Sequence, residues 1–155
     1  MKEGEPIKSV RELVERAQIQ LVLHDRLIWE NGYSEGRFHS MEERKQQQCL
    51  EAAWIVSHGL DTVMSRGDLR LLNQEIETVE APIRNQRSFE CEAIEPILWA
   101  CSLVEKLTPV GKFMLSDFHA LLVGQLKDDL FRTGRLRKEE EIASQRDIFM
   151  LWYWR

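Results

Sequence analysis

The fold is decided by residues 88–107, which read SFECEAIEPILWACSLVEKL. Apolar side chains in this segment would cover most of the circumference of an α-helix: Phe89, Ala93, Ile94, Ile97, Leu98, Trp99, Cys101, Val104 and Leu107. A helix that is apolar on nearly all sides is typical of a buried position, so we expect a central helix at about 88–107. Pro96 leaves two alternatives, because a proline inside a helix removes a hydrogen bond and kinks the axis. Either the helix bends there, or it begins near Glu95.

Two capping-box patterns predict helix starts before this segment. Ser9 with Glu12, and Ser40 with Glu43, have the Ser-x-x-Glu spacing in which each side chain satisfies a free backbone N–H of the other. An apolar series at helical spacing follows each box. We expect the second of these helices to end at Gly59, since glycine is the commonest residue after a helix end.

The chain on either side of the central segment divides into shorter pieces. A short helical piece should stop at Gly67, with Asp68 capping the next one. Residues 75–87, which are charged and contain a proline, are typical of a helix end and a connecting loop. One helix is expected over 116–133, and a last helix should begin with the acidic residues from Glu139 onward.

Together these signals predict an all-α protein. Neither an alternating strand pattern of useful length nor an internal repeat is visible in the sequence. We therefore expect a compact, irregular bundle of about six helices, forming a single helical domain over residues 1–155. The predicted core includes Trp54, Trp99 and Trp152.

The composition is that of a folded domain, with 43% apolar and 30% charged residues. A net charge of −5 gives no general attraction to phosphate backbones, so nucleic acid is not an expected partner. No stretch approaches the roughly 18 apolar residues of a membrane span, and the charged segment 1–6 does not fit a signal peptide. We expect a cytoplasmic protein whose cysteines, Cys49, Cys91 and Cys101, are reduced core residues.

The sequence contains no catalytic or cofactor-binding motif that we can identify. The glycines form no phosphate-binding loop, and the His-Glu-x-x-His and Gly-x-Ser-x-Gly patterns are absent. The four histidines lie far apart in the chain, so we expect neither a metal nor a cofactor. Glu92 and Glu95 share a helix face, where paired carboxylates could do acid–base work. The simpler alternative is that one pairs with a core arginine and the other reaches solvent.

One acidic segment and one aromatic segment are candidates for contact with another protein. Glu75, Glu77 and Glu80 form an acidic cluster in the predicted loop, for which a solvated loop is the simpler account and a short interaction surface the alternative. At the C-terminal end, consecutive aromatic residues would point in different directions from a helix. Trp154 is therefore a candidate contact residue, with packing against the first helices as the alternative.

Residues 86–107 and 136–154 resemble two helices of a bacterial family of domains of unknown function, DUF4272. The matching residues are Ser88 to Ala93, Leu98-Trp99-Ala100, Leu103, Leu136-Arg137, Glu140-Glu141-Ile142, Asp147-Ile148 and Trp154. The resemblance covers about 40–155 and implies a cytosolic helical domain with no established activity. Glu92 and Asp147 match recurrent polar positions of that family.

The chain also departs from this family. The family has an arginine at the position of Glu90 and a tryptophan at that of Glu95, and Pro96 is atypical. Leu151 and Tyr153 stand in place of an arginine and a histidine. If the family uses those groups in a site, this chain lacks that site.

The features together favour a non-enzymatic protein-binding module of the immunity or accessory kind. Its partner would be another protein, and the sequence leaves the oligomeric state open. The alternative is an enzyme or small-ligand binder with an acidic pocket near Glu92, Glu95 and Asp147.

Overall fold

The computed structural model of the chain describes residues 9–30, 33–34, 37–108, 115–124 and 127–145. Its elements confirm the all-α class. The α-helices are α1 (Val10–Glu30), α2 (Met41–Ser57), α3 (Arg66–Asn73), α4 (Ala81–Glu90), α5 (Ile94–Ala100), α6 (Ser116–Leu122) and α7 (Lys127–Thr133). Residues 139–145 are also helical. Short 3-10 turns are η1 (Leu60–Thr62) and η2 (Cys91–Ala93), and two-residue strands β1 (Tyr33–Ser34) and β2 (Arg37–Phe38) pair antiparallel.

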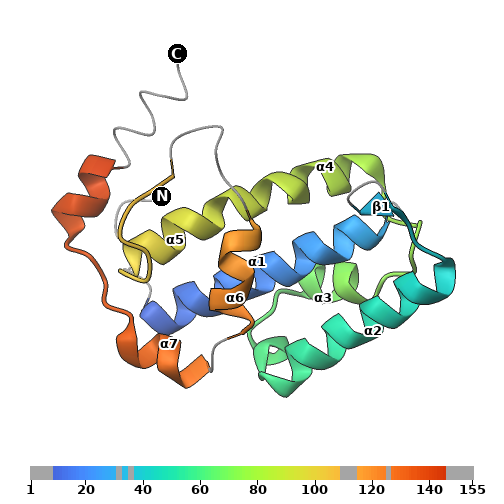
Figure 1. The fold of residues 1–155 in the computed structure, drawn as a ribbon, viewed down its shortest axis with the longest axis horizontal. Coiled ribbons are helices and arrows are strands. Elements are labelled where there is room, and N and C mark those ends of the chain that lie inside the picture. Colours follow the sequence, from blue (N-terminus) through green and yellow to red (C-terminus); the bar gives the residue numbers. More distant parts are fainter. Residues whose placement is uncertain (1–8, 31–32, 35–36, 109–114, 125–126, 146–155) are drawn as a thin grey trace, which may run out of the picture.

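The central element is α1, which contacts α2, α3, α4, α5, α6 and α7. Figure 1 shows α1 running through the middle of the bundle, with α4 and α5 along one side and α2 along the other. Val14 and Leu21 of α1 join one buried cluster with α5, α6 and α7, whereas Val22 and Leu27 join a second cluster with α2 and α3. The central position predicted for 88–107 is therefore corrected, because α1 has apolar sides that reach both clusters.

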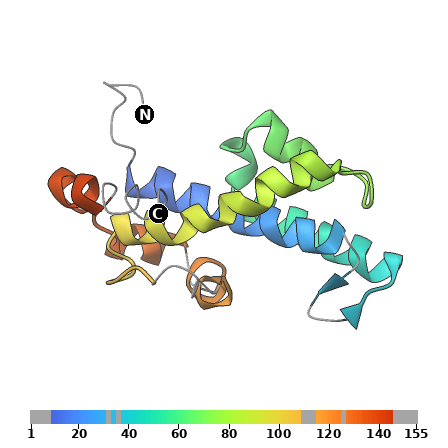
Figure 2. The same ribbon diagram turned by 90° about the horizontal axis from the view of Figure 1, so that it is seen from above.

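The helix predicted over 88–107 belongs to a run that starts and ends earlier. α4, η2 and α5 follow one another as a nearly continuous rod, which Figure 2 shows from above. Beyond α5, Ser102 has a left-handed φ of 55°, and the backbone N–H of Leu103 donates to the carbonyl of Leu98 (2.9 Å). Helices commonly end with a left-handed residue followed by a hydrogen bond to a carbonyl five residues earlier in the chain. The helical run therefore stops before the last residues of the predicted segment.

Prolines mark two helix starts in this rod. Pro82 lies in the first turn of α4, so the loop predicted over 75–87 is already helical in its second half. Pro96 lies in the first turn of α5. A proline is tolerated in a first turn, because its missing N–H would have no partner within the helix there. Of the two alternatives for Pro96, the structure supports a helix start close to Glu95.

Both predicted capping boxes are present. The backbone N–H of Ser9 donates to the carboxylate of Glu12 (2.8 Å), and the N–H of Glu12 donates to the Ser9 hydroxyl (3.2 Å). Ser40 and Glu43 make the same pair of bonds, at 2.7 and 3.2 Å. Gly59 has a φ of 65° directly after α2, as predicted for a helix end.

Other predicted boundaries are wrong. Gly67 does not stop a helix and Asp68 does not cap one, because the Ser65 hydroxyl accepts the N–H of Asp68 and starts α3 earlier (3.1 Å). The helix predicted over 116–133 is two helices, α6 and α7. The last helix does begin at Glu139, as predicted.

The core is aliphatic, and two of the predicted tryptophans lie at its edge. Trp54 and Trp99 are half-buried. The Trp54 ring stacks on His58, and the Arg137 guanidinium lies over the Trp99 ring (4.5 Å to the centroid). Trp152 lies outside the described residues. Among the cysteines, Cys91 and Cys101 are buried as predicted, but Cys49 is exposed.

Candidate functional site

The two carboxylates proposed to act together lie near the junction of α4 and α5, in different surroundings. Glu92 is exposed, whereas Glu95 is buried and accepts hydrogen bonds from the backbone N–H (2.7 Å) and hydroxyl (2.5 Å) of Thr108. The Glu95 carboxylate therefore fixes the chain that follows α5, which is a structural role. Asp147 lies outside the described residues.

The acidic candidates in the loop before α4 are all exposed. Glu75, Glu77 and Glu80 alternate there with Ile76 and Val79, whose side chains are buried. The loop is thus a tightly held segment that presents carboxylates outward. Trp154 lies outside the described residues.

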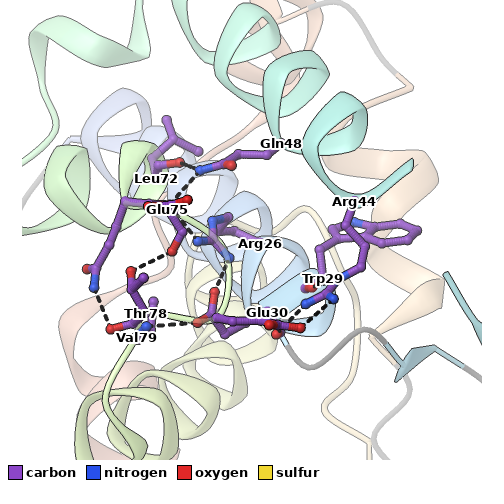
Figure 3. A network of polar contacts seen from close by, with 11 residues as sticks. Arg26, Trp29, Glu30, Arg44, Gln48, Leu72, Glu75, Thr78 and Val79 are labelled. Carbon is purple, nitrogen blue, oxygen red and sulfur yellow. Dashed lines mark hydrogen bonds and ion pairs between the residues drawn. The ribbon is translucent and has the colours of Figure 1, made fainter. Parts of the chain in front are cut away.

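A buried ion pair holds this loop to α1. Arg26 is fully buried and donates to the Glu30 carboxylate and to the carbonyl of Gln74, each at 2.8 Å. The other oxygen of Glu30 accepts the backbone N–H of Val79 (2.8 Å). Figure 3 shows these contacts bridging α1 and the loop. Such extra hydrogen bonds offset the desolvation of a buried ion pair. Both Glu30 oxygens and both Arg26 Nη atoms are bonded here, whereas the Arg26 Nε is buried without a hydrogen-bond partner among the described residues.

A second buried arginine adds α2 to this network. Arg44 donates to the carbonyls of Trp29 and Glu30, each at 2.8 Å, and to the Glu77 carboxylate at 2.7 Å. Gln48, one turn further along α2, donates to the carbonyls of Leu72 and Gln74, both at 2.8 Å. Figure 3 shows the Arg44 contacts at the end of α1 and the Gln48 contacts beside the loop. The polar network therefore joins α1, α2 and the acidic loop into one unit.

The solvent side of α2 carries apolar residues in addition to those on its inward side, where Ile55 is buried and Ala52 and Trp54 pack against the second cluster. The buried residues of the helix are Arg44, Glu51 and Ile55, two of which are charged. Its solvent side carries Cys49, Leu50, Ala53 and Val56, with Leu50 56% and Val56 62% exposed. Their spacing of three and four residues places them along one side of the helix. An apolar stripe on the solvent side is unusual, because that side of a surface helix is ordinarily polar.

A cluster of titratable side chains between α1, α2 and α6 is the feature that the sequence did not reveal. His119 pairs with Asp25 (2.9 Å), and the pKa of Asp25 is raised because burial outweighs that pairing. Burial lowers the pKa of His24, and its Nδ1 is buried without a hydrogen-bond partner among the described residues. Burial, followed by like-charge repulsion from Asp25, raises the pKa of Glu51 on the inward side of α2. No local spacing connects these groups, because they come from three helices.

The described part of the chain contains no group of three or more His, Cys, Asp or Glu side chains placed to hold a metal ion. None of its helices combines the length and the apolar character that a membrane crossing requires. In comparisons with known proteins, no family model, no curated protein and no solved structure matches the chain.

Proposed function

We propose that the protein is a non-enzymatic protein-binding module that docks a basic amphipathic helix of its partner onto the outer side of α2. The observation that carries the proposal is the apolar stripe formed by Cys49, Leu50, Ala53 and Val56 on the solvent side of α2. Scattered exposed apolar residues are ordinary, but a continuous row at helical spacing is typical of a contact surface. Helices commonly dock through such rows, with anchors one turn apart.

The charge around the stripe supports a basic partner. Glu42, near the start of α2, is exposed, and the neighbouring loop presents Glu75, Glu77 and Glu80. The 2.7 Å contact between Arg44 and Glu77 places this loop beside the same helix. Arg44 is on the buried side of α2, so the exposed side of the helix itself contributes Glu42, and the loop adds negative charge nearby. These acidic groups would attract lysine and arginine and would disfavour acidic partners, which gives specificity and a faster encounter.

The polar network beneath α2 supports a preformed surface. Arg44 and Gln48 each bind two backbone carbonyls from other segments, so the helix is held at several points along its length. A surface that is already ordered loses little conformational entropy when a partner binds. A module of the immunity or accessory kind binds its partner without catalysing a reaction, so a preformed binding surface is sufficient for its function.

The proposal is tested with a synthetic probe, a labelled amphipathic peptide about five turns long with leucine along one side and lysine on the flanks. Binding is followed by fluorescence anisotropy. The double variant Leu50→Gln/Val56→Gln should weaken binding about tenfold or more, because both anchors lose their apolar contact. Glutamine is a good helix former and adds no charge, so α2 should remain folded.

Phe89→Gln is the matched control. Phe89 is 69% exposed on α4, away from the stripe, so its loss should leave the affinity unchanged. The charge component is tested by Glu75→Gln/Glu80→Gln, which should weaken binding at low salt and reduce its salt dependence. If Phe89→Gln weakens binding as much as the α2 variant, or the α2 variant binds like the wild type, the proposed surface is wrong.

A further inference from the structure

Glu51 occupies an unfavourable position for a charged group. It lies on the inward side of α2, with 7% of its surface exposed. Both carboxylate oxygens are buried and neither has a hydrogen-bond partner among the described residues. Gln47 and Trp29 approach the carboxylate without reaching hydrogen-bonding geometry. An ionised carboxylate in such a place would carry the full cost of desolvation, so a proton is the simplest way to remove that cost.

The charged neighbours of Glu51 do not remove the cost. Asp25 and Arg26, both on α1, are the groups that act on it. The Arg26 guanidinium is already bonded to Glu30 and to the carbonyl of Gln74. Asp25 repels a second negative charge, and its own carboxylate is paired with His119 of α6.

Among the residues that the structure describes, α3 and η1, the other elements with extensive contacts to α2, direct no cation at Glu51. In α3, Arg66 and Arg70 are exposed, while Asp68 is bonded to Arg16 of α1 and Arg87 of α4 (2.9 and 2.8 Å). In η1, the charged residue is the half-buried Asp61. Burial, together with the repulsion from Asp25, raises the pKa of Glu51 to about 8 against the opposing effect of Arg26.

We propose that Glu51 is a proton-controlled latch between α1 and α2: the helices pack closely while its carboxyl group is protonated and separate more readily once it ionises. The inference is independent of the proposed docking function, since it concerns the underside of α2. It predicts that the inner contact of α2 weakens as the pH rises from 4.5 to about 8 while the rest of the core stays packed.

The sign of the effect follows from the two protonation states. In an opened state, Glu51 regains an ordinary pKa near 4.5, whereas in the closed state the pKa is about 8. Below the lower value both states are protonated and packing is at its strongest. Between the two values the closed state holds one more proton, so opening becomes about tenfold more favourable with each pH unit. Above about pH 8 the effect levels off.

The protonation state can be measured directly. The carboxyl carbon of Glu51 is followed by NMR from pH 4 to 10 in the full chain, with Glu51→Gln used to assign the signal. The proposal predicts a midpoint near pH 8. A midpoint near 4.5 in the folded protein would overturn it.

The pH dependence of the separation of α2 from α1 is measured by amide hydrogen exchange in α2, under conditions where the exchange rate reports the opening equilibrium. After correction for intrinsic rates, protection of amides between Gln47 and Ile55 should fall about tenfold per pH unit from 6 to 8. Glu51→Gln should abolish this dependence, and Glu51→Met serves if the glutamine variant does not fold. Glu42→Gln, an exposed change in the same helix, should retain the wild-type slope. Protection that is flat with pH in the wild type, or a slope that persists in both Glu51 variants, would overturn the proposal.

Discussion

The Nη1 atom of Arg26 lies 2.8 Å from a carboxylate oxygen of Glu30 one turn later, and both side chains are at most 1% exposed. The pair bonds onward to the carbonyl of Gln74 and the N–H of Val79, 48 and 49 residues away in sequence. This relationship positions the acidic loop against α1. The underside of the proposed docking surface therefore depends on two charged residues that are inaccessible to solvent.

Removing one member of this pair should be costly. Arg26→Leu leaves the Glu30 carboxylate buried without its cation, and we expect a loss of about 3–5 kcal/mol in the free energy of unfolding by urea denaturation. Arg132→Leu is the control, because Arg132 and Asp129 form a similarly short pair (2.6 Å) with side chains 78% and 45% exposed. It should change stability by less than about 1 kcal/mol. Equal losses from both substitutions would show that burial of the Arg26 pair is unimportant.

Glu92 and Glu95, near the junction of α4 and α5, should differ in the same assay. Glu95→Ala removes the acceptor of both Thr108 hydrogen bonds and should cost about 2 kcal/mol. Glu92→Ala changes an exposed side chain and should stay within about 0.5 kcal/mol of the wild type. A large loss from Glu92→Ala alone would mean that the assigned roles are reversed.

Thiol reactivity distinguishes the three cysteines. Cys49 is exposed on the α2 stripe, whereas Cys91 and Cys101 are buried. Burial raises the pKa of Cys101 to about 11, and burial with the repulsion of Glu92 raises that of Cys91. The thiolate is the reactive form of cysteine. Ellman's reagent at pH 8 should therefore react rapidly with one thiol of the native protein and with all three after unfolding. Fast reaction of two or more thiols in the native state would contradict the assignment of the buried pair.

The helix starts that were predicted correctly depend on local chemistry. The Ser-x-x-Glu boxes at Ser9 and Ser40 involve residues three positions apart, so the sequence contains the whole interaction. Gly67 was misread for a related reason, because the Ser65 hydroxyl supplies a cap two residues earlier. Residues 101–107 were misread because an apolar helical pattern continues past Ser102, whose left-handed backbone ends the helix.

The orientation of α2 was not predictable from periodicity. Leu50 and Ala53 are the kind of residues that ordinarily face a core, yet they are exposed, and Arg44 and Glu51 are buried alongside Ile55. Arg44 can be buried only because backbone carbonyls from the end of α1 and a carboxylate from a distant loop accept its hydrogen bonds. Such partners are brought together only by the tertiary structure. The pairing of Asp25 with His119 could not be predicted from local spacing for the same reason.

The resemblance to DUF4272 and the single-domain organisation stay predictions. The candidate residues Asp147 and Trp154 lie outside the described part of the chain. Of the remaining candidates, the exposed acids Glu75, Glu77 and Glu80 enter the proposed docking surface, and the Glu92–Glu95 pair does not form a joint site in the structure.

The most direct test of the docking surface is the position of the bound probe peptide on the protein. Backbone amide shifts of the isotope-labelled chain are recorded while the unlabelled lysine-flanked peptide is added. The account predicts that the largest changes fall in residues 46–57 and 75–80, with little change around Phe89 on α4. Changes concentrated elsewhere, or an equal response to a peptide whose lysines are replaced by glutamates, would contradict the assignment of α2 as the binding surface for a basic partner.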